Sequence, residues 1–149
     1  MEKICIACSA GGHLTEVLQL KKAWCKKEHF LITDNRAKLE NYTKTHKTYF
    51  VECPRRDPLK FLTNFKETYK ILRKEKPTII ISTGADTALA ALILGKTMGA
   101  KIVFIESFCR ITSPSLTGKL VYPFADEFFV QWKENLVFYP KAKYYGRVF

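Results

Sequence analysis

Short apolar runs rich in Ile, Val and Phe alternate with longer segments of helical periodicity along nearly the whole chain, and this alternation limits the possible folds. Six runs are strand candidates: Ile4–Cys8, His29–Thr33, Thr48–Glu52, Thr78–Ser82, Lys101–Ile105 and Glu127–Trp132. Several are apolar throughout, as expected for strands that are covered on both faces of a sheet. The alternation predicts βαβ units and therefore an α/β fold with a parallel sheet.

Five segments between these runs have helical periodicity: His13–Lys26, Arg36–Tyr42, Pro58–Lys74, Asp86–Met98 and Ser115–Phe124. The first has an inward-facing apolar stripe made of Leu14, Val17, Leu18 and Trp24. A chain of 149 residues is long enough for one buried core and too short for two, so residues 1–149 are expected to form one domain. The basic, aromatic tail Pro140–Phe149 is expected to need another chain to pack on.

The charge of the chain favours a polyanionic partner. Its 25 basic and 14 acidic residues give a net charge of +11, which suits a nucleic acid, an anionic membrane surface or a diphosphate-bearing substrate. Nucleic acid is not expected, because no recognition motif is present and the basic residues are spread over several helices.

The apolar runs and the cysteines indicate a cytoplasmic protein. The longest apolar stretches, Thr78–Ile81 and Ala88–Leu94, are far shorter than the roughly 20 residues that cross a bilayer, and no export signal is recognisable. The five cysteines are odd in number and lack framework spacing, so free thiols are expected. Cys5 and Cys8 form a CxxC on an expected strand, where they point to opposite faces and cannot share a metal.

A small-residue loop joins the first strand to the first helix and predicts an anion site. Gly11 and Gly12 let the backbone approach a ligand, and the unpaired N–H groups of the first helical turn face it. An ordinary tight turn is the alternative, because any sharp βα turn favours glycine. His13 ends the loop at the carboxyl edge of the sheet, where it fits a general base or a phosphate ligand equally well.

A second strand, loop and helix with similar chemistry follows at Ile79–Asp86. Ser82, Thr83 and Gly84 offer hydroxyls and open backbone amides at the same edge. Asp86 is expected mainly to cap the helix that starts there.

Glu106 directly follows the fifth strand and falls at the same edge. Its carboxylate fits a role in accepting a hydrogen bond from a sugar hydroxyl or in orienting His13, and a solvated loop acid is the alternative. Ser107 and Arg110 follow it and can hold other polar groups.

The segment Pro58–Lys74 and the residues before it combine cationic and aromatic side chains. A membrane-facing surface for anionic headgroups is predicted from Arg55, Arg56, Lys60, Phe61 and Phe65. An ordinary core helix is the alternative.

Three segments together, Ser9–Glu16, Ser82–Ala85 and Ile105–Trp132, resemble the bacterial polysaccharide-biosynthesis family that includes PssD, EpsE and CpsF. This family is the counterpart of asparagine-linked glycosylation protein fourteen, the membrane-anchoring subunit of a eukaryotic dolichol-linked N-acetylglucosaminyltransferase. It is also related to the acceptor domain of MurG. The resemblance covers nearly the whole chain and implies a single Rossmann-like domain equivalent to the N-terminal half of a GT-B glycosyltransferase.

The resemblance implies a function shared between two chains. This chain would bind an undecaprenyl-diphosphate-linked acceptor, and a second GT-B-type subunit would bind the UDP-sugar, for capsule or exopolysaccharide synthesis. His13 or Glu106 would deprotonate the acceptor hydroxyl, with no cofactor and no metal. The remaining acceptor or phosphate contacts would come from Ser9, Gly11, Gly12, Thr83, Gly84, Ala85, Ser107 and Arg110. Attachment to the inner face of the plasma membrane would be peripheral, because the first expected strand lies at the start of the sequence.

Two other functions are compatible with the pattern. One is a non-catalytic scaffold that recruits the catalytic partner to the membrane. The other is a nucleotide-binding Rossmann protein, because Asp34 follows Gly12 by about twenty residues, where a ribose ligand is expected. The absence of GxGxxG from the first loop weakens the nucleotide interpretation.

Overall fold

The fold is known from a computed structural model, which describes residues 1–36 and 40–148. Within these residues one sheet of seven strands has the order β3-β2-β1-β4-β5-β6-β7, with every neighbouring pair parallel. The strands are β1 Lys3–Cys8, β2 Glu28–Asp34, β3 Thr48–Val51, β4 Ile79–Gly84, β5 Lys101–Ile105, β6 Glu127–Val130 and β7 Lys143–Tyr144. The α/β class, the parallel sheet and the six expected strands are therefore confirmed.

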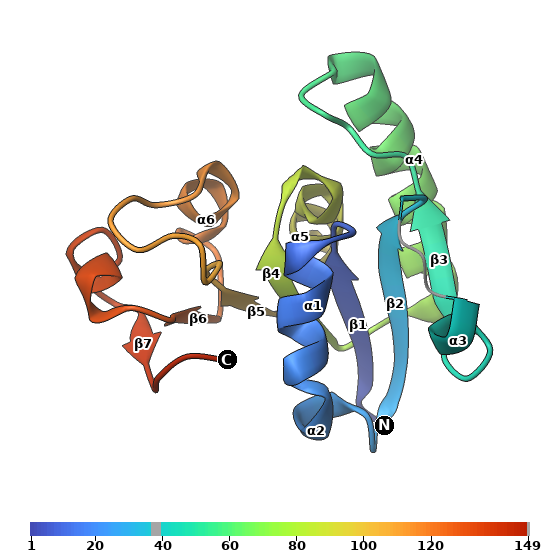
Figure 1. Ribbon diagram of the computed structural model, residues 1–149. Coiled ribbons are helices and arrows are strands. Elements are labelled where there is room, and N and C mark those ends of the chain that lie inside the picture. Colours follow the sequence, from blue (N-terminus) through green and yellow to red (C-terminus); the bar gives the residue numbers. More distant parts are fainter. Residues whose placement is uncertain (37–39, 149) are drawn as a thin grey trace.

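The helices that connect the strands lie on both faces of the sheet (Figure 1). They are α1 Gly12–Gln19, α2 Lys21–Trp24, α3 Glu40–Thr43, α4 Pro58–Glu75, α5 Asp86–Thr97 and α6 Leu116–Val121, with a 3-10 helix η1 at Lys133–Val137. The expected helices Pro58–Lys74 and Asp86–Met98 match α4 and α5, and α6 forms the middle of the expected Ser115–Phe124. Of the expected helix Arg36–Tyr42, residues 37–39 lie outside the described residues.

The expected continuous helix His13–Lys26 is wrong in one respect. Leu20, with φ −86° and ψ 11°, ends α1 and starts the short helix α2. The break lets Trp24 fold back beneath α1, where it is fully buried and its Nε1 donates to the carbonyl of Val17 at 3.4 Å. Tertiary burial of one large side chain thus overrides the helical periodicity of the segment.

The sheet separates two apolar clusters, and the alternation of side chains along β1 assigns its residues to one or the other. Cys5 packs in the cluster beneath α4, α5 and α6, whereas Cys8 packs in the cluster beneath α1 and α2. The prediction that this CxxC points to opposite faces is confirmed. Burial raises the pKa of both thiols.

The expectation that the tail after residue 140 needs a second chain to pack on is also wrong. Residues 143–144 form β7, which pairs with Phe129 and Val130 of β6. The amide of Val148 donates to Gln131 Oε1 at 3.1 Å. The tail therefore packs on its own sheet, and a two-residue strand carries too little pattern to be recognised in the sequence.

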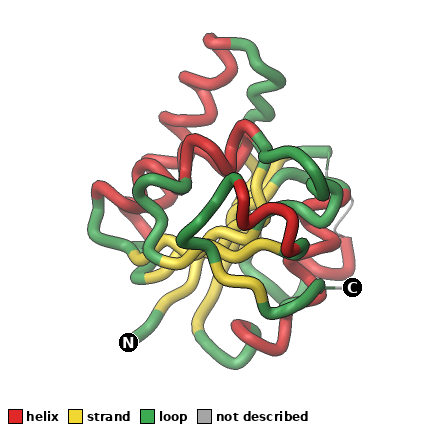
Figure 2. The backbone as a smooth tube through the Cα atoms, turned by 90° about the vertical axis from the view of Figure 1, so that its left-hand side faces the viewer, coloured by secondary structure: helices red, strands yellow, loops and turns green. Residues whose placement is uncertain are grey.

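Helix α4 starts beyond the carboxyl edge of the sheet, and its N-terminal half projects away from the body in both views (Figure 1, Figure 2). Among the described residues no helix is both long and apolar enough to cross a membrane.

Candidate functional site

The loops that follow β1, β4 and β5 meet at the carboxyl edge of the sheet and surround a pocket of about 560 Å³. Six residues predicted from the sequence contribute to its lining: Gly12, His13, Arg56, Ala85, Ser107 and Arg110. The other lining residues are Glu16, Asp86, Cys109, Ser115, Leu116 and Thr117. The predicted Ser9, Gly11 and Glu106 lie in these loops, and Thr83 and Gly84 end β4, but none of the five is among the lining residues.

His13 is oriented by Thr83. Its Nδ1 lies 2.8 Å from the carbonyl oxygen of Thr83, and because a carbonyl only accepts, Nδ1 carries the proton. Nε2 therefore holds the lone pair of the neutral ring. The Thr83 hydroxyl donates to the carbonyl of His13 at 2.7 Å. Thr83, which was predicted to contact the acceptor, therefore holds both the ring and the backbone of His13.

Gly84 explains why the second loop runs so close to His13. Its φ of +111° is in the left-handed region, and a Cβ there would lie 3.5 Å from His13 Cε1 and 3.5 Å from Phe104 Cζ. Its amide donates to the Ser82 hydroxyl at 3.0 Å. Glycine at this position lets the strand end turn beside the histidine.

Two helices begin at the pocket. Gly11 (φ +92°) and Ala85 (φ +73°) are the residues that precede α1 and α5, and neither has a side chain that can accept a capping hydrogen bond. Asp86, expected to cap α5, is the first residue of the helix and not the residue before it, and its carboxylate accepts from the first-turn amide of Thr87 at 2.9 Å. Both helix starts offer backbone N–H groups to an anion, although the Asp86 carboxylate already accepts from one of those of α5.

Glu106 is buried and fully engaged with protein groups. One carboxylate oxygen accepts from the Ser107 amide at 2.9 Å, and the other accepts from the Ser115 amide at 3.0 Å and the Tyr139 hydroxyl at 2.7 Å. A Cβ at Gly118 would come within 2.4 Å of Glu106 Oε2. The carboxylate thus anchors the two ends of the β5–α6 loop, and its role as a base stays a prediction.

Glu16 is one of two carboxylates that line the pocket, the other being Asp86, and sequence reasoning did not select Glu16. Its Oε1 accepts from the Ser107 hydroxyl at 2.9 Å and from the Phe108 amide at 3.1 Å. Burial raises the pKa of Glu16, although these hydrogen bonds and the charge of His13 oppose the shift. Its spacing of three residues from His13 on one helix was the available signal.

Asp34, the predicted ribose contact, is fully buried and holds the glycine loop. It accepts from the Ala10 amide at 3.1 Å and from the Thr87 hydroxyl at 3.2 Å, and it forms a two-pronged pair with Arg36 at 2.8 and 2.9 Å. Burial opposes its ionisation, but the hydrogen bonds from Arg36 and Ala10 outweigh burial and lower the pKa. Both oxygens are used, which disfavours nucleotide binding here.

Residues 4–148 match the family described as "Oligosaccharide biosynthesis protein Alg14 like". The chain belongs to the Alg14 family. It is 28% identical over 180 residues to the mouse (Mus musculus) UDP-N-acetylglucosamine transferase subunit ALG14, covering 98% of this chain and 82% of the relative. The subunit of the same name from Yarrowia lipolytica is 30% identical over 172 residues, with coverage of 97% and 80%.

Solved structures place this Alg14-family chain in the Rossmann-like half of the GT-B fold. Acinetobacter baumannii MurG matches with a TM-score of 0.72 and 12% identity over 87% of this chain. A UDP-N-acetylglucosamine 2-epimerase from Rickettsia bellii matches with a TM-score of 0.78 and 14% identity over 99% of this chain. The chain spans 41% and 45% of those two proteins, less than half of each, and the predicted fold class is confirmed.

In this Alg14-family chain the start of α4 carries exposed apolar and basic side chains, which we call the α4 tip (residues 55–66). Leu59 and Leu62 are 75% and 55% exposed. The predicted Phe61 and Phe65 are half-buried and contact each other, with ring centroids 6.2 Å apart. The cations of the α4 tip are Arg55, Arg56, Lys60 and Lys66.

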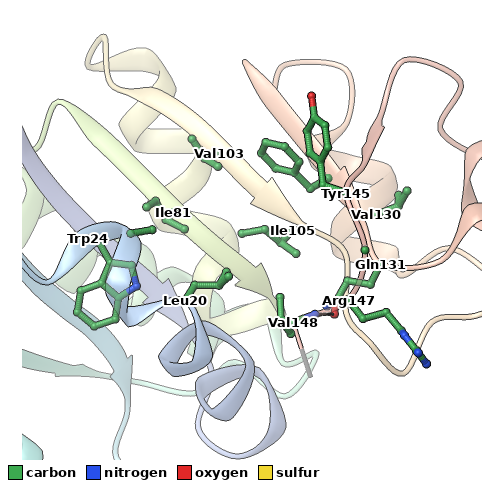
Figure 3. A pocket seen from close by; sticks show the side chains of 13 residues that line it. Leu20, Trp24, Ile81, Val103, Ile105, Val130, Gln131, Tyr145, Arg147 and Val148 are labelled. Atoms are coloured by element: carbon green, nitrogen blue, oxygen red, sulfur yellow. Dashed lines mark hydrogen bonds between the residues drawn. The ribbon is translucent and has the colours of Figure 1, made fainter.

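A second pocket of about 420 Å³ lies on the α1 face of β4, β5 and β6 (Figure 3). Its floor is made of Ile81, Val103, Ile105 and Phe129, which alternate with the side chains beneath α5 and α6. Trp24 and the tail residues 145–148 border it. No helix among residues 1–36 and 40–148 fully covers this part of the sheet, although parallel sheets are usually covered on both faces.

Proposed function

We propose that this Alg14-family chain is the acceptor-binding, membrane-associating subunit of a two-chain glycosyltransferase. The enzyme transfers a sugar from a UDP-sugar to an undecaprenyl-diphosphate-linked acceptor, in capsule or exopolysaccharide synthesis. The observation that carries the proposal is the hydrogen bond from His13 Nδ1 to Thr83, which leaves the Nε2 lone pair of this pocket-lining histidine to accept a proton. The relatives named UDP-N-acetylglucosamine transferase subunits support glycosyl transfer and make UDP-N-acetylglucosamine the first donor to test.

In the proposed reaction His13 acts as the general base. The acceptor hydroxyl gives its proton to Nε2, and its oxygen forms a bond to the anomeric carbon of the donor sugar. The bond from that carbon to UDP breaks, and its electron pair leaves with the diphosphate. The starts of α1 and α5, with Arg56 and Arg110 at the rim, hold the diphosphate of the acceptor lipid.

The α4 tip binds the anionic inner face of the plasma membrane in this proposal. Leu59 and Leu62 enter the headgroup region, and Arg55, Arg56 and Lys60 pair with acidic lipids. Because Arg56 also lines the pocket, the tip and the pocket are adjacent. A lipid-linked diphosphate at the membrane surface therefore reaches the pocket without leaving the membrane.

The partner is a second GT-B-type subunit that binds the UDP-sugar. This chain spans less than half of the matching glycosyltransferase MurG, which supports a donor side supplied by a second domain. The apolar pocket over β4–β6 fits this partner, because covering it would complete the second face of the sheet.

Co-expression with the product of the adjacent gene tests the proposal. The assembled pair is assayed with a panel of UDP-sugars and with undecaprenyl- and dolichyl-diphosphate acceptors. We expect a complex, transfer to the undecaprenyl acceptor, and a loss of roughly 100-fold or more in His13→Ala. His29→Ala is the control, because His29 lies near the amino end of β2, whereas the pocket lies at the carboxyl edge of the sheet.

Two outcomes contradict the proposal. No complex and no transfer would exclude the split enzyme. Full transfer by both His13→Ala and Glu106→Ala would leave a non-catalytic scaffold as the function.

A further inference from the structure

Glu16 has no role in the chemistry proposed above, although it lies in the pocket wall. It is only 3% exposed, yet it contributes to the lining with His13. Residues three apart on a helix lie on the same side, with Cβ atoms about 5–6 Å apart. The carboxylate and the proposed base are therefore neighbours on α1.

The carboxylate also joins α1 to the β5–α6 loop. Oε1 accepts from the Ser107 hydroxyl and the Phe108 amide, and Gln131 Nε2 lies 3.4 Å from Oε2. The Ser107 hydroxyl in turn accepts from the Cys109 amide at 3.3 Å. These bonds set the path of the loop that brings Arg110 to the pocket.

Ionisation of this carboxylate opposes folding, because the charged form is buried. Burial raises the pKa of Glu16 above its unfolded value, and the hydrogen bonds only partly offset that effect. A group with a raised pKa stabilises the fold at low pH, and the contribution is lost as the pH rises through the folded pKa. A buried charge that reduces stability at a pocket is typical of residues that serve function.

We propose that Glu16 is a positioning residue of the transfer reaction, which holds residues 107–110 across the pocket and stabilises the cationic form of His13. This inference rests on the proposed role of His13 as base. When His13 takes up the hydroxyl proton it becomes an imidazolium, and an ionised carboxylate on the same side of α1 attracts it. Glu16 thus acts through its Oε1 contacts and through its charge.

Two variants separate these contributions. Glu16→Gln removes the charge but keeps an oxygen that can accept from Ser107 and Phe108, whereas Glu16→Ala removes both. Glu134→Gln is the matched control, because Glu134 is an exposed acid on η1. The readouts are kcat and acceptor KM of the assembled pair, urea unfolding of the isolated chain, and amide hydrogen exchange of residues 107–110.

We expect Glu16→Gln to lower kcat roughly tenfold or more while the acceptor KM stays within about twofold. Its unfolding midpoint near neutral pH should equal or exceed that of the unchanged chain. Glu16→Ala should lower kcat, raise the acceptor KM, and speed exchange at residues 107–110 roughly tenfold or more. Glu134→Gln should change none of these.

Three results would overturn the inference. An unchanged kcat in Glu16→Gln would leave Glu16 with a structural role only, and unchanged exchange in Glu16→Ala would exclude the loop contact. A lowered kcat in Glu16→Gln with full activity in His13→Ala would exclude the pairing with His13. If the unchanged pair transfers no sugar, the proposed function fails, and exchange in the isolated chain still decides the loop contact.

Discussion

His13 and Thr83 are the residues on which the candidate site depends most closely. A free histidine ring can carry its proton on either nitrogen, and the Thr83 carbonyl selects the tautomer whose Nε2 accepts a proton. The Thr83 hydroxyl holds the backbone of the same histidine. Two loops that are 70 residues apart in sequence therefore act as one unit.

The Thr83 hydroxyl gives a prediction at this scale. Thr83→Val removes the donor to the His13 carbonyl and leaves the carbonyl that orients the ring. We expect transfer by the assembled pair to fall roughly tenfold, with about 1 kcal/mol lost from the unfolding free energy. The measurements are initial rates and urea unfolding.

Thr97→Val is the control, because the Thr97 hydroxyl donates only to Leu94 within α5. Equal rates in the two variants would mean that the Thr83 hydroxyl does not order the base.

At the scale of elements, Glu75 fastens the end of α4 to the strands. Its carboxylate pairs with Lys3 at 2.7 Å and Lys47 at 2.6 Å and accepts from the Tyr49 hydroxyl. Burial opposes its ionisation, but these contacts outweigh burial and lower the pKa to about 2.

This network predicts a dependence of stability on pH. Because the folded pKa of about 2 is below the ordinary 4.5, the stabilisation is complete above pH 4.5 and is lost as the pH falls toward 2. Glu75→Gln should lower the unfolding free energy at neutral pH by roughly 2–3 kcal/mol and flatten this acid limb. Urea unfolding between about pH 7 and pH 2.5 measures both effects.

Glu127→Gln is the control, because Glu127 forms solvent-exposed pairs with Lys101 and Lys143. It should lose much less stability. If the unfolding free energy of Glu75→Gln depended on pH in the same way as that of the unchanged chain, Glu75 would not be the source of the acid dependence.

The α4 tip supplies a second prediction at this scale. The double variant Leu59→Ser and Leu62→Ser removes exposed apolar surface without touching the core. Sedimentation with phosphatidylglycerol vesicles should show binding reduced roughly tenfold or more, with unfolding unchanged.

Val137→Ser is the control, because Val137 is 80% exposed on η1, away from the α4 tip. Equal vesicle binding by the two variants would exclude the tip as the membrane contact.

At the scale of the whole molecule, the uncovered part of the sheet predicts where the partner binds. Val103→Lys places a charge on the floor of the apolar pocket over β4–β6, where the side chain is half-buried and can reach solvent. We expect the isolated chain to fold and the complex with the partner subunit to be lost on size-exclusion chromatography. Val137→Lys should leave the complex intact, and a stable complex of Val103→Lys would exclude this face.

The sequence predicted strands more reliably than helices, for a physical reason. Parallel strands covered on both faces are continuous apolar runs, so Ile4–Cys8 was recognisable. Lys101–Ile105 has the same pattern, although part of one face lines the apolar pocket. The break at Leu20 and the short strand β7 depend on contacts with distant segments. The same holds for Glu16, whose partners Ser107 and Gln131 lie 91 and 115 residues away.

By itself, then, the sequence determined the α/β class, the order of its main elements, and the glycine loop with His13 at the carboxyl edge of the sheet. Local patterns carry that information, because apolar periodicity and turn residues act over a few positions. Only the tertiary structure decided which carboxylates face the pocket. Glu106 is used in holding the β5–α6 loop and Asp34 in holding Arg36, whereas Glu16 and Asp86 line the pocket. The role of a buried carboxylate depends on which hydrogen-bond donors surround it. These donors come from distant parts of the chain, and the spacing of residues in the sequence does not reveal them.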